Sequence, residues 1–148
     1  MKEKKKLLLA AVLLLAAAGL TVWHLTAVDM PEGARKTAVS DAEVEAAGKF
    51  AVKLVRLAQK NKQRDFLQLC RKPNDGEMRL FFNGMREAQL PENPVVIESG
   101  ELEKQPGLVT VCFANPAGGR YQFTFSREAG SPDGWKFCGF YVLPGEMK

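Results

Sequence analysis

Few residues of this chain have side chains suited to acid–base or metal chemistry near neutral pH. The 148 residues include one histidine, His24, and three cysteines, Cys70, Cys112 and Cys138. A histidine-based triad, a Cys–His dyad and a zinc site that uses imidazole all need a histidine in the folded region. His24 lies in an apolar run near the amino terminus, where we expect an interface residue. We therefore predict no catalytic residue, no metal ligand and no cofactor.

The three cysteines are expected to be reduced and mostly buried. Their spacings of 42 and 26 residues resemble no metal-binding motif. Cys112 and Cys138 fall on predicted strands with another strand between them, and backbones two strands apart are separated by about 9.6 Å. A disulfide needs Cα atoms within about 7 Å, so no disulfide is predicted. The thiols would then act as small apolar side chains.

Aromatic side chains supply the candidates for ligand binding. Phe81, Tyr121, Phe123, Trp135 and Tyr141 fall on faces that we expect to point inward. They would either line an apolar pocket or form the core of a small domain, which needs such residues to bury enough area. We favour the core, because pockets are few per protein. The five residues are kept as cavity-lining candidates.

Carboxylates are clustered on the first predicted strand. Glu98, Glu101 and Glu103 form an acidic patch there. We interpret the patch as charge that discourages pairing at the edge of a sheet. A role in binding a metal or a partner is the minor alternative.

The amino-terminal segment predicts the compartment. Residues 7–28 contain no Asp, Glu, Lys or Arg, and a helix that crosses a bilayer needs about 20 apolar residues. Four lysines precede this run, which predicts a single-pass membrane protein with a cytoplasmic amino terminus and an extracytoplasmic domain. Residues 1–28 are thus interpreted as a membrane anchor and residues 29–39 as a linker. The alternative is a signal peptide that is cleaved near Ala18 and releases a secreted or periplasmic domain.

The remaining charges are nearly balanced. After residues 1–28, the chain holds 17 Lys and Arg against 16 Asp and Glu. The signs are interspersed, and no stripe of Lys and Arg interleaves with aromatic residues. Nucleic-acid binding is therefore not predicted.

Helices occupy the first half of the predicted domain. Residues 40–63 carry an apolar stripe at helical spacing and open with Ser40 and Glu43 at the spacing of a capping box. A brief helix with Asp65 as its N-cap and a third helix over residues 77–90 follow. Gly84 lies in this third helix, where we expect it to allow a close packing contact.

Strands occupy the second half. Residues 95–103, 107–113, 120–126 and 135–143 each alternate or run apolar, and short turns join them into an antiparallel meander. The outer face of this sheet receives Cys112, Cys138, Phe140 and Val142. An exposed apolar patch there would indicate a protein partner or a homodimer. The predicted class is α+β, with helices packed on one face of a curved, four-stranded antiparallel meander and a membrane or signal helix before them.

This order of elements resembles the nuclear transport factor 2-like fold. The resemblance rests on the long capped helix, the short helix at "RDFLQL", the third helix and the meander that ends in "DGWKFCGFYVL". It covers residues 40–143 and is closest to small exported members of unassigned function. It implies a cone, in which the sheet wraps the long helix and leaves a cavity that some members use for catalysis and others for binding or assembly.

No catalytic residue is carried over from that family. Dehydratase-type members use a His–Asp pair, and the predicted domain has no histidine. Isomerase-type members use an aspartate base, whereas Asp65, Asp75 and Asp133 fall at helix starts or in turns. Fold alone does not give function.

We therefore expect residues 40–148 to form a non-catalytic, membrane-tethered extracytoplasmic domain for binding or assembly. The membrane would be contacted through residues 7–28, and a protein partner or a second copy through the outer sheet face. The alternative is a small-molecule-binding protein or an isomerase- or dehydratase-like enzyme that uses the cone cavity. An open interior with a buried carboxylate or tyrosine would favour that alternative.

Overall fold

A computed structural model describes residues 36–145 of the chain. Among these residues, no helix is both long and apolar enough to cross a membrane. The predicted anchor over residues 7–28 lies outside the described residues, as does the predicted cleavage position near Ala18. The domain described below is therefore the part that the sequence assigns to binding or assembly.

The longest helix, α2, spans Asp41–Gln59 and has defined caps at both ends. The hydroxyl oxygen of Ser40 accepts a hydrogen bond from the Glu43 backbone N–H at 3.3 Å, which confirms the predicted N-cap. After the helix, Asn61 adopts a φ of 57°, and the Lys62 N–H donates to the Leu57 carbonyl at 2.9 Å. This is a Schellman motif, which turns the chain sharply into the next helix.

Two shorter helices follow α2. Helix α3 spans Gln63–Gln68, so Asp65 lies within its first turn; the predicted N-cap role of Asp65 is wrong because the helix begins two residues earlier. Helix α4 spans Glu77–Arg86. A Cβ atom at Gly84 would lie 3.2 Å from the Phe140 ring, so this glycine allows the close contact expected of it.

The second half of the chain forms an antiparallel meander, as predicted, but the sheet has five strands instead of four. The strand order is β1-β2-β3-β4-β5. The added strand falls in the predicted linker, where two residues pair with Glu101 and Leu102. A two-residue strand is too short to show an alternating pattern, which is why the sequence did not reveal it. The strands are β1 (Lys36–Thr37), β2 (Val96–Leu102), β3 (Leu108–Ala114), β4 (Arg120–Arg127) and β5 (Trp135–Leu143).

An irregularity in β5 changes which side chains point inward. Phe125 pairs with Phe137, but Thr124 pairs with Gly139, so one extra residue stands between these two pairs in β5. Such a bulge reverses the alternation after it. Phe140 consequently faces the core with Phe123, and Tyr141 shares the face of Gln122. Val142 pairs with Tyr121 and therefore also lies on the core side. The predictions that Phe140 and Val142 lie on the outer face and Tyr141 on the inner face are therefore wrong.

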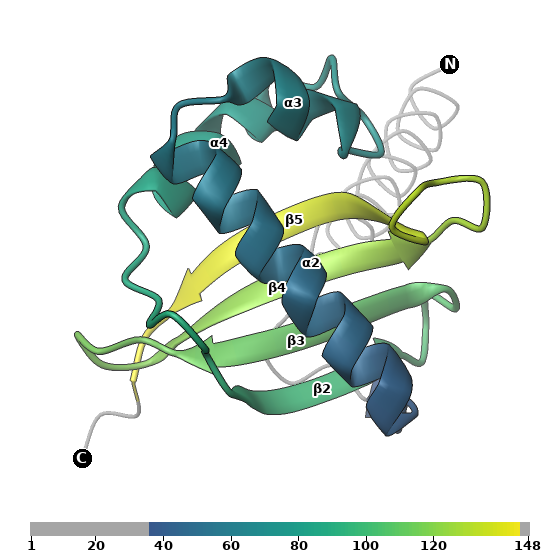
Figure 1. Ribbon diagram of the computed structural model, residues 1–148. Helices are drawn as coiled ribbons and strands as arrows, with labels where there is room; N and C mark the ends of the chain where they lie inside the picture. The colour runs from purple at the N-terminus through teal and green to yellow at the C-terminus, as the bar shows by residue number, and fades with distance from the viewer. Residues whose placement is uncertain (1–35, 146–148) are drawn as a thin grey trace, which may run out of the picture. The chain divides into compact units, whose positions relative to one another are not determined.

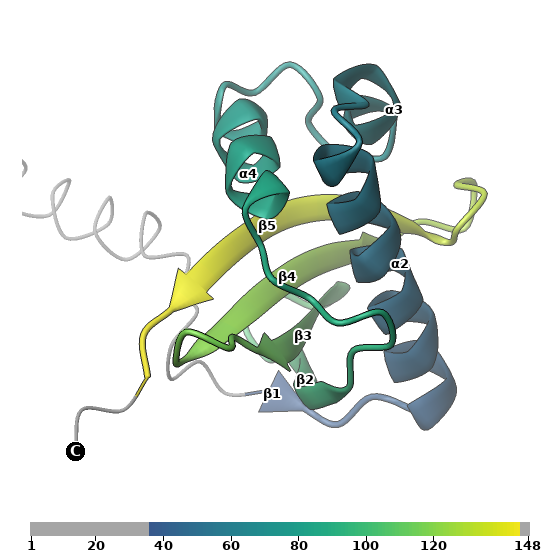
Figure 2. The same cartoon turned by 60° about the vertical axis from the view of Figure 1, so that its left-hand side comes forward.

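All three helices lie on one face of the twisted, curved sheet, and α2 crosses the strands diagonally (Figure 1). Figure 2 shows α4 beside α2 over the end of the sheet formed by β4 and β5. The core between the layers is aromatic. Its fully buried rings come from α3 and three neighbouring strands: Phe66, Phe113, Phe123, Phe125 and Phe137.

Candidate functional site

The aromatic residues proposed to line a cavity mostly pack against one another. Phe123 is 0 % exposed, and its ring centroid lies 5.7 Å from that of Phe113 and 5.0 Å from that of Phe140. Trp135 is buried against Phe125, at 6.3 Å between centroids. These contacts are typical of a filled aromatic core.

The tyrosine hydroxyl in this region is engaged in structure. The Tyr121 hydroxyl accepts a hydrogen bond from the Gln89 backbone N–H and donates one to the Asn115 side-chain oxygen, each at 3.1 Å. Tyr121 thereby ties the segment after α4 to the turn between β3 and β4. This hydroxyl is not directed at an open cavity.

The other two candidates lie at the edge of the sheet. Phe81 of α4 is half-buried, with its ring 5.7 Å from Phe137 and 5.8 Å from Tyr141 between centroids. Tyr141 follows the bulge and belongs to the opposite face from Tyr121. The structure therefore does not bring the five candidates together around one cavity.

A groove lies elsewhere, between the amino-terminal half of α2 and the segment that leads into β2. Its volume is about 510 Å³, and it is open to solvent. Helix α2 contributes one stripe at helical spacing, made by Asp41, Val44, Glu45, Gly48, Lys49 and Val52; the opposite wall is Glu92, Asn93, Pro94 and Val96. We call these ten residues the α2–β2 groove. None of the five predicted aromatic candidates lines it.

The α2–β2 groove has an apolar floor and a charged rim. Gly48 is buried, and a Cβ atom there would lie 3.1 Å from Val96, so the two walls approach closely at this point. Lys49 donates to Glu45 at 2.8 Å and lowers the pKa of that carboxyl. Asp41 and Glu92 are exposed and make no ion pair within residues 36–145. The rim thus carries an excess of negative charge.

Two exposed apolar residues flank the lining residue Val96 in the sequence. Val95 is 75 % exposed and Ile97 is 56 % exposed, and both are neighbours of the lining residue Val96. Ile97 is the extra residue at the irregularity between Val96 and Glu98 of β2. The chemistry of this lining fits an apolar side chain next to a basic group.

Two of the three carboxylates predicted as an acidic patch, Glu98 and Glu101, form ion pairs within the domain, whereas Glu103 follows β2 and forms none within residues 36–145. The Arg127 guanidinium contacts both Glu43 oxygens, at 2.7 and 3.1 Å, and Glu101 at 3.0 Å. These hydrogen bonds lower the pKa of both carboxyls and raise that of Arg127. The cluster links α2, β2 and β4, so its role is structural.

A second ion pair cluster lies on the other face of β2. Lys36 donates to Glu98 at 2.7 Å, and Arg120 lies 3.6 Å from the same carboxylate. The hydrogen bond from Lys36 lowers the pKa of Glu98. No group of three or more His, Cys, Asp or Glu residues suited to a metal ion occurs within residues 36–145.

The three thiols are unbonded to one another. Strand β4 lies between Cys112 of β3 and Cys138 of β5, as the sequence predicted. Burial raises the pKa of Cys70 to about 12 and also raises that of Cys112. A raised pKa disfavours the reactive thiolate, so neither is suited to nucleophilic chemistry.

The structure does not place the four residues predicted for the outer sheet face together as an exposed apolar patch. Phe140 belongs to the core, and Val142 is exposed but pairs with Tyr121 and so lies on the core side of the sheet. Cys112 is buried and Cys138 is half-buried. These four residues therefore form no exposed apolar patch on the outer face, and the proposed partner or homodimer contact there stays a prediction.

A basic surface at the far end of α2 was missed by the sequence analysis. Residues 60–72 contain Lys60, Lys62, Arg64, Arg71 and Lys72 but a single carboxylate, Asp65. We call these five cations the basic end. All five are exposed, and none forms an ion pair within the described part of the chain. Counting charges in short windows, rather than over the whole domain, would have found it.

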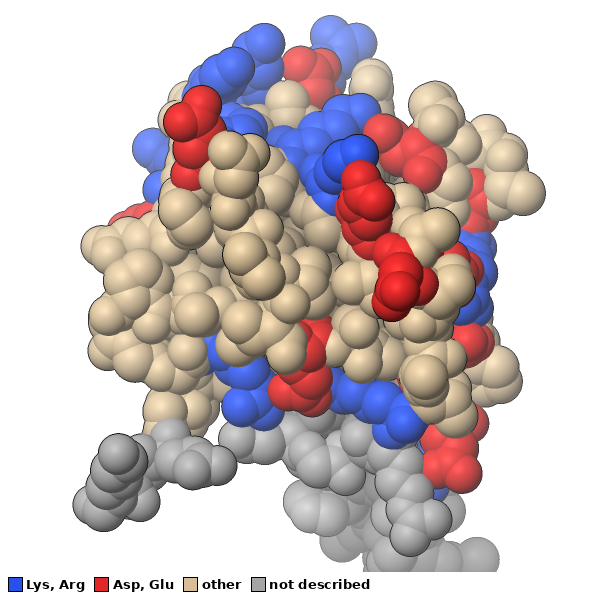
Figure 3. All heavy atoms as spheres, turned by 60° about the horizontal axis from the view of Figure 1, so that its bottom comes forward, with Lys and Arg blue, Asp and Glu red and all other residues tan. Residues whose placement is uncertain are grey.

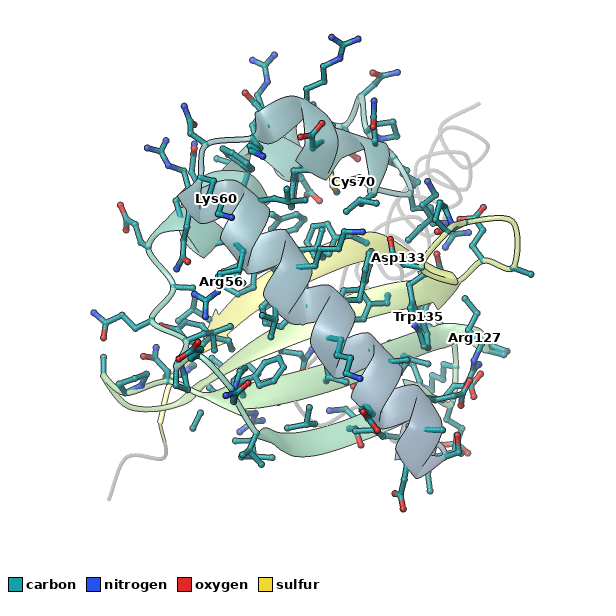
Figure 4. All side chains as sticks on the ribbon, viewed as in Figure 1. Arg56, Lys60, Cys70, Arg127, Asp133 and Trp135 are labelled. Carbon is teal, nitrogen blue, oxygen red and sulfur yellow. The ribbon has the colours of Figure 1, made fainter. Side chains whose placement is uncertain are left out.

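The labelled side chains locate these features on the domain. Lys60 and Arg56 lie near the end of α2, with Cys70 beneath the neighbouring helix, whereas Arg127, Asp133 and Trp135 lie at the opposite margin of the sheet (Figure 4). On the side viewed in Figure 3, acidic and basic side chains lie beside one another around a broad uncharged area.

Comparisons with models of protein families, with curated proteins and with solved structures found no significant match to this chain. The resemblance to the nuclear transport factor 2-like fold, which rests on the order of elements, therefore stays a prediction.

Proposed function

We propose that the domain is a non-catalytic binding or assembly module, tethered to a membrane through residues 7–28 and lying on the extracytoplasmic side. The observation that carries the binding role is the filled aromatic interior together with the open α2–β2 groove at the surface. An enzyme of the cone type needs an interior cavity that encloses its substrate. Packed rings occupy that interior, so a surface-binding role has more support than the enzymatic alternative.

The groove is proposed as the contact for a protein partner. Its volume of about 510 Å³ is large enough for one or two side chains of a partner. Val44, Val52 and Val96 offer apolar contact, and Asp41 and Glu92 offer negative charge to a neighbouring basic group. Neither carboxylate has an ionic partner among the described residues.

Site-directed photo-crosslinking in cells tests this role. A benzophenone amino acid at position 49, on the groove rim, should give one discrete adduct, whereas the same residue at position 104, in an exposed turn, should give none. Val52→Trp fills the groove and should abolish the adduct; Val142→Trp adds an equal side chain at an exposed site outside it and should not. An adduct that persists with Val52→Trp would contradict the proposal.

The tether is tested separately. Mass spectrometry of the chain isolated from membranes should find an uncleaved amino terminus, in keeping with the positive flank and apolar run. A mature terminus near Gly19 would contradict the anchor and leave the binding role of the domain unaffected.

A further inference from the structure

Ion pairs are unevenly distributed over the cations of the described domain. Five cations outside the basic end are each paired with a carboxylate: Lys36, Lys49, Lys53, Arg120 and Arg127. The five cations of the basic end have no such partner within residues 36–145. Other described cations, such as Arg79 and Lys104, are also without an ion pair, but they are spread along the chain. The basic end concentrates five unpaired cations within 13 consecutive residues, 60–72.

Local structure explains how these cations are brought together. The Schellman motif at Asn61 turns the chain from α2 directly into α3, so Lys60 and Lys62 lie next to the first turn that carries Arg64. At the other end of α3, the Arg71 N–H donates to the Phe137 carbonyl at 2.9 Å, which anchors the chain there. Lys136 of the neighbouring strand adds a sixth positive charge, since its amine donates to the Gln68 carbonyl at 2.9 Å.

Packing does not require these cations. The residues of this region that enter the core are Phe66 and Cys70, and the five basic side chains are exposed. Clustered like charges repel one another and lower the stability of a folded domain, while they raise the local concentration of oppositely charged partners. The cluster is therefore better explained by an interaction than by the fold.

An exposed apolar residue lies on the neighbouring helix. Leu80 of α4 is 71 % exposed and follows Arg79, which is also exposed. Helices α3 and α4 are held together by the rings of Phe66 and Phe82, whose centroids are 5.2 Å apart. Leu80 is two positions from Phe82, so its side chain points away from this ring contact and toward solvent. A partner that contacts both helices would offer carboxylates to the basic end and apolar side chains to Leu80.

We propose that the basic end binds an acidic segment of a partner protein that also carries apolar residues. This interaction uses a surface distinct from the α2–β2 groove, so each can fail without the other. It also predicts strong dependence on ionic strength, because the charges involved are exposed.

Fluorescence anisotropy with a labelled peptide of alternating Glu and Leu provides the test, with the full chain in a non-ionic detergent. Binding should weaken about tenfold between 50 and 300 mM salt. Lys62→Glu combined with Lys72→Glu should weaken it about tenfold or more. The matched control, Arg86→Glu with Lys104→Glu, makes the same change in net charge at exposed sites outside both the basic end and the α2–β2 groove, and should bind like the parent.

Two further arms identify the kind of partner. Replacing the peptide's leucines with serine should weaken binding to the parent about threefold, and Leu80→Ser should remove that difference. Phosphatidylglycerol in the micelles should displace the peptide less effectively, per unit charge, than an unlabelled copy of the peptide does.

Three results would overturn the proposal. The first is no binding by the parent at 50 mM salt. The second is equal weakening by the two double variants, which would indicate net charge rather than this surface. The third is stronger displacement by phosphatidylglycerol, which would indicate a lipid-binding surface.

Discussion

Two regions of the domain treat charge in opposite ways. Where α2 meets the sheet, Arg127 joins Glu43 and Glu101 within 3.1 Å, and Lys53 contacts Asp133 at 2.9 Å. At the basic end, five cations are exposed with no ion pair among the described residues. Charges of the first region join elements distant in the sequence, so they serve the fold. Charges of the second contribute nothing to packing and remain available to a partner.

The aromatic core that both regions share should give the largest effect. Phe123→Ala should lower the free energy of unfolding by about 3–5 kcal/mol, because it removes a ring that is fully buried against Phe113 and Phe140. Urea denaturation measures the change. Leu80→Ala, at an exposed site, is the control and should change stability by about 0.5 kcal/mol or less. Similar curves for the two variants would contradict the assignment of Phe123 to the core.

Arg127→Gln should test the paired region directly. Hydrogen bonds from Arg127 lower the pKa of Glu43 and Glu101 in the folded state, so their contribution is present above the ordinary carboxyl pKa of about 4.3. This stabilising contribution is lost as the pH falls through the lowered pKa values of Glu43 and Glu101 in the folded state. The variant should therefore melt about 4 °C below the parent at pH 7, with a smaller difference below about pH 4.

Arg79→Gln is the matched control for that experiment. Arg79 is exposed and makes no ion pair within residues 36–145, so its variant should melt like the parent at both pH values. If Arg79→Gln and Arg127→Gln lower the melting temperature equally, the contrast between the two regions does not hold.

A double-mutant cycle on Lys53 and Asp133 should show a smaller effect. The Lys53 amine contacts both Asp133 oxygens, at 2.9 and 3.1 Å, but both side chains are partly exposed. Lys53→Met and Asp133→Asn should give a coupling energy of about 0.2–1 kcal/mol. The same cycle with Lys60→Met in place of Lys53→Met should give none. Zero coupling in both cycles would show that the Lys53–Asp133 pair does not stabilise the fold.

The smallest change in the free energy of unfolding is expected at the basic end, and there the substitution should stabilise the domain. Lys72→Glu removes a cation from a cluster of like charge without disturbing a packed side chain. We expect stability to rise by up to about 0.5 kcal/mol, measured by urea denaturation in low salt, because repulsion is reduced. A loss of about 1 kcal/mol or more would show that the basic end serves the fold.

Local sequence patterns determined the elements of the domain. The capping residue Ser40, the apolar stripe of α2 and the alternation at Tyr121, Phe123 and Phe125 predicted a helix and a strand that the structure contains. The α+β class and the antiparallel meander were predicted in the same way. These features depend on residues close together in the chain, so periodicity and caps are enough to reveal them.

Tertiary structure decided the rest. The bulge that turns Phe140 inward, the two-residue strand β1 and the α2–β2 groove all depend on how distant segments meet. The pairing of Arg127 with Glu43, which are 84 positions apart, has no local signature either. The basic end depends on both the local sequence and the tertiary structure. Its concentration of positive charge is visible in the sequence of residues 60–72. Only the fold shows that these cations are unpaired, because pairing is set by which carboxylates come within reach in space.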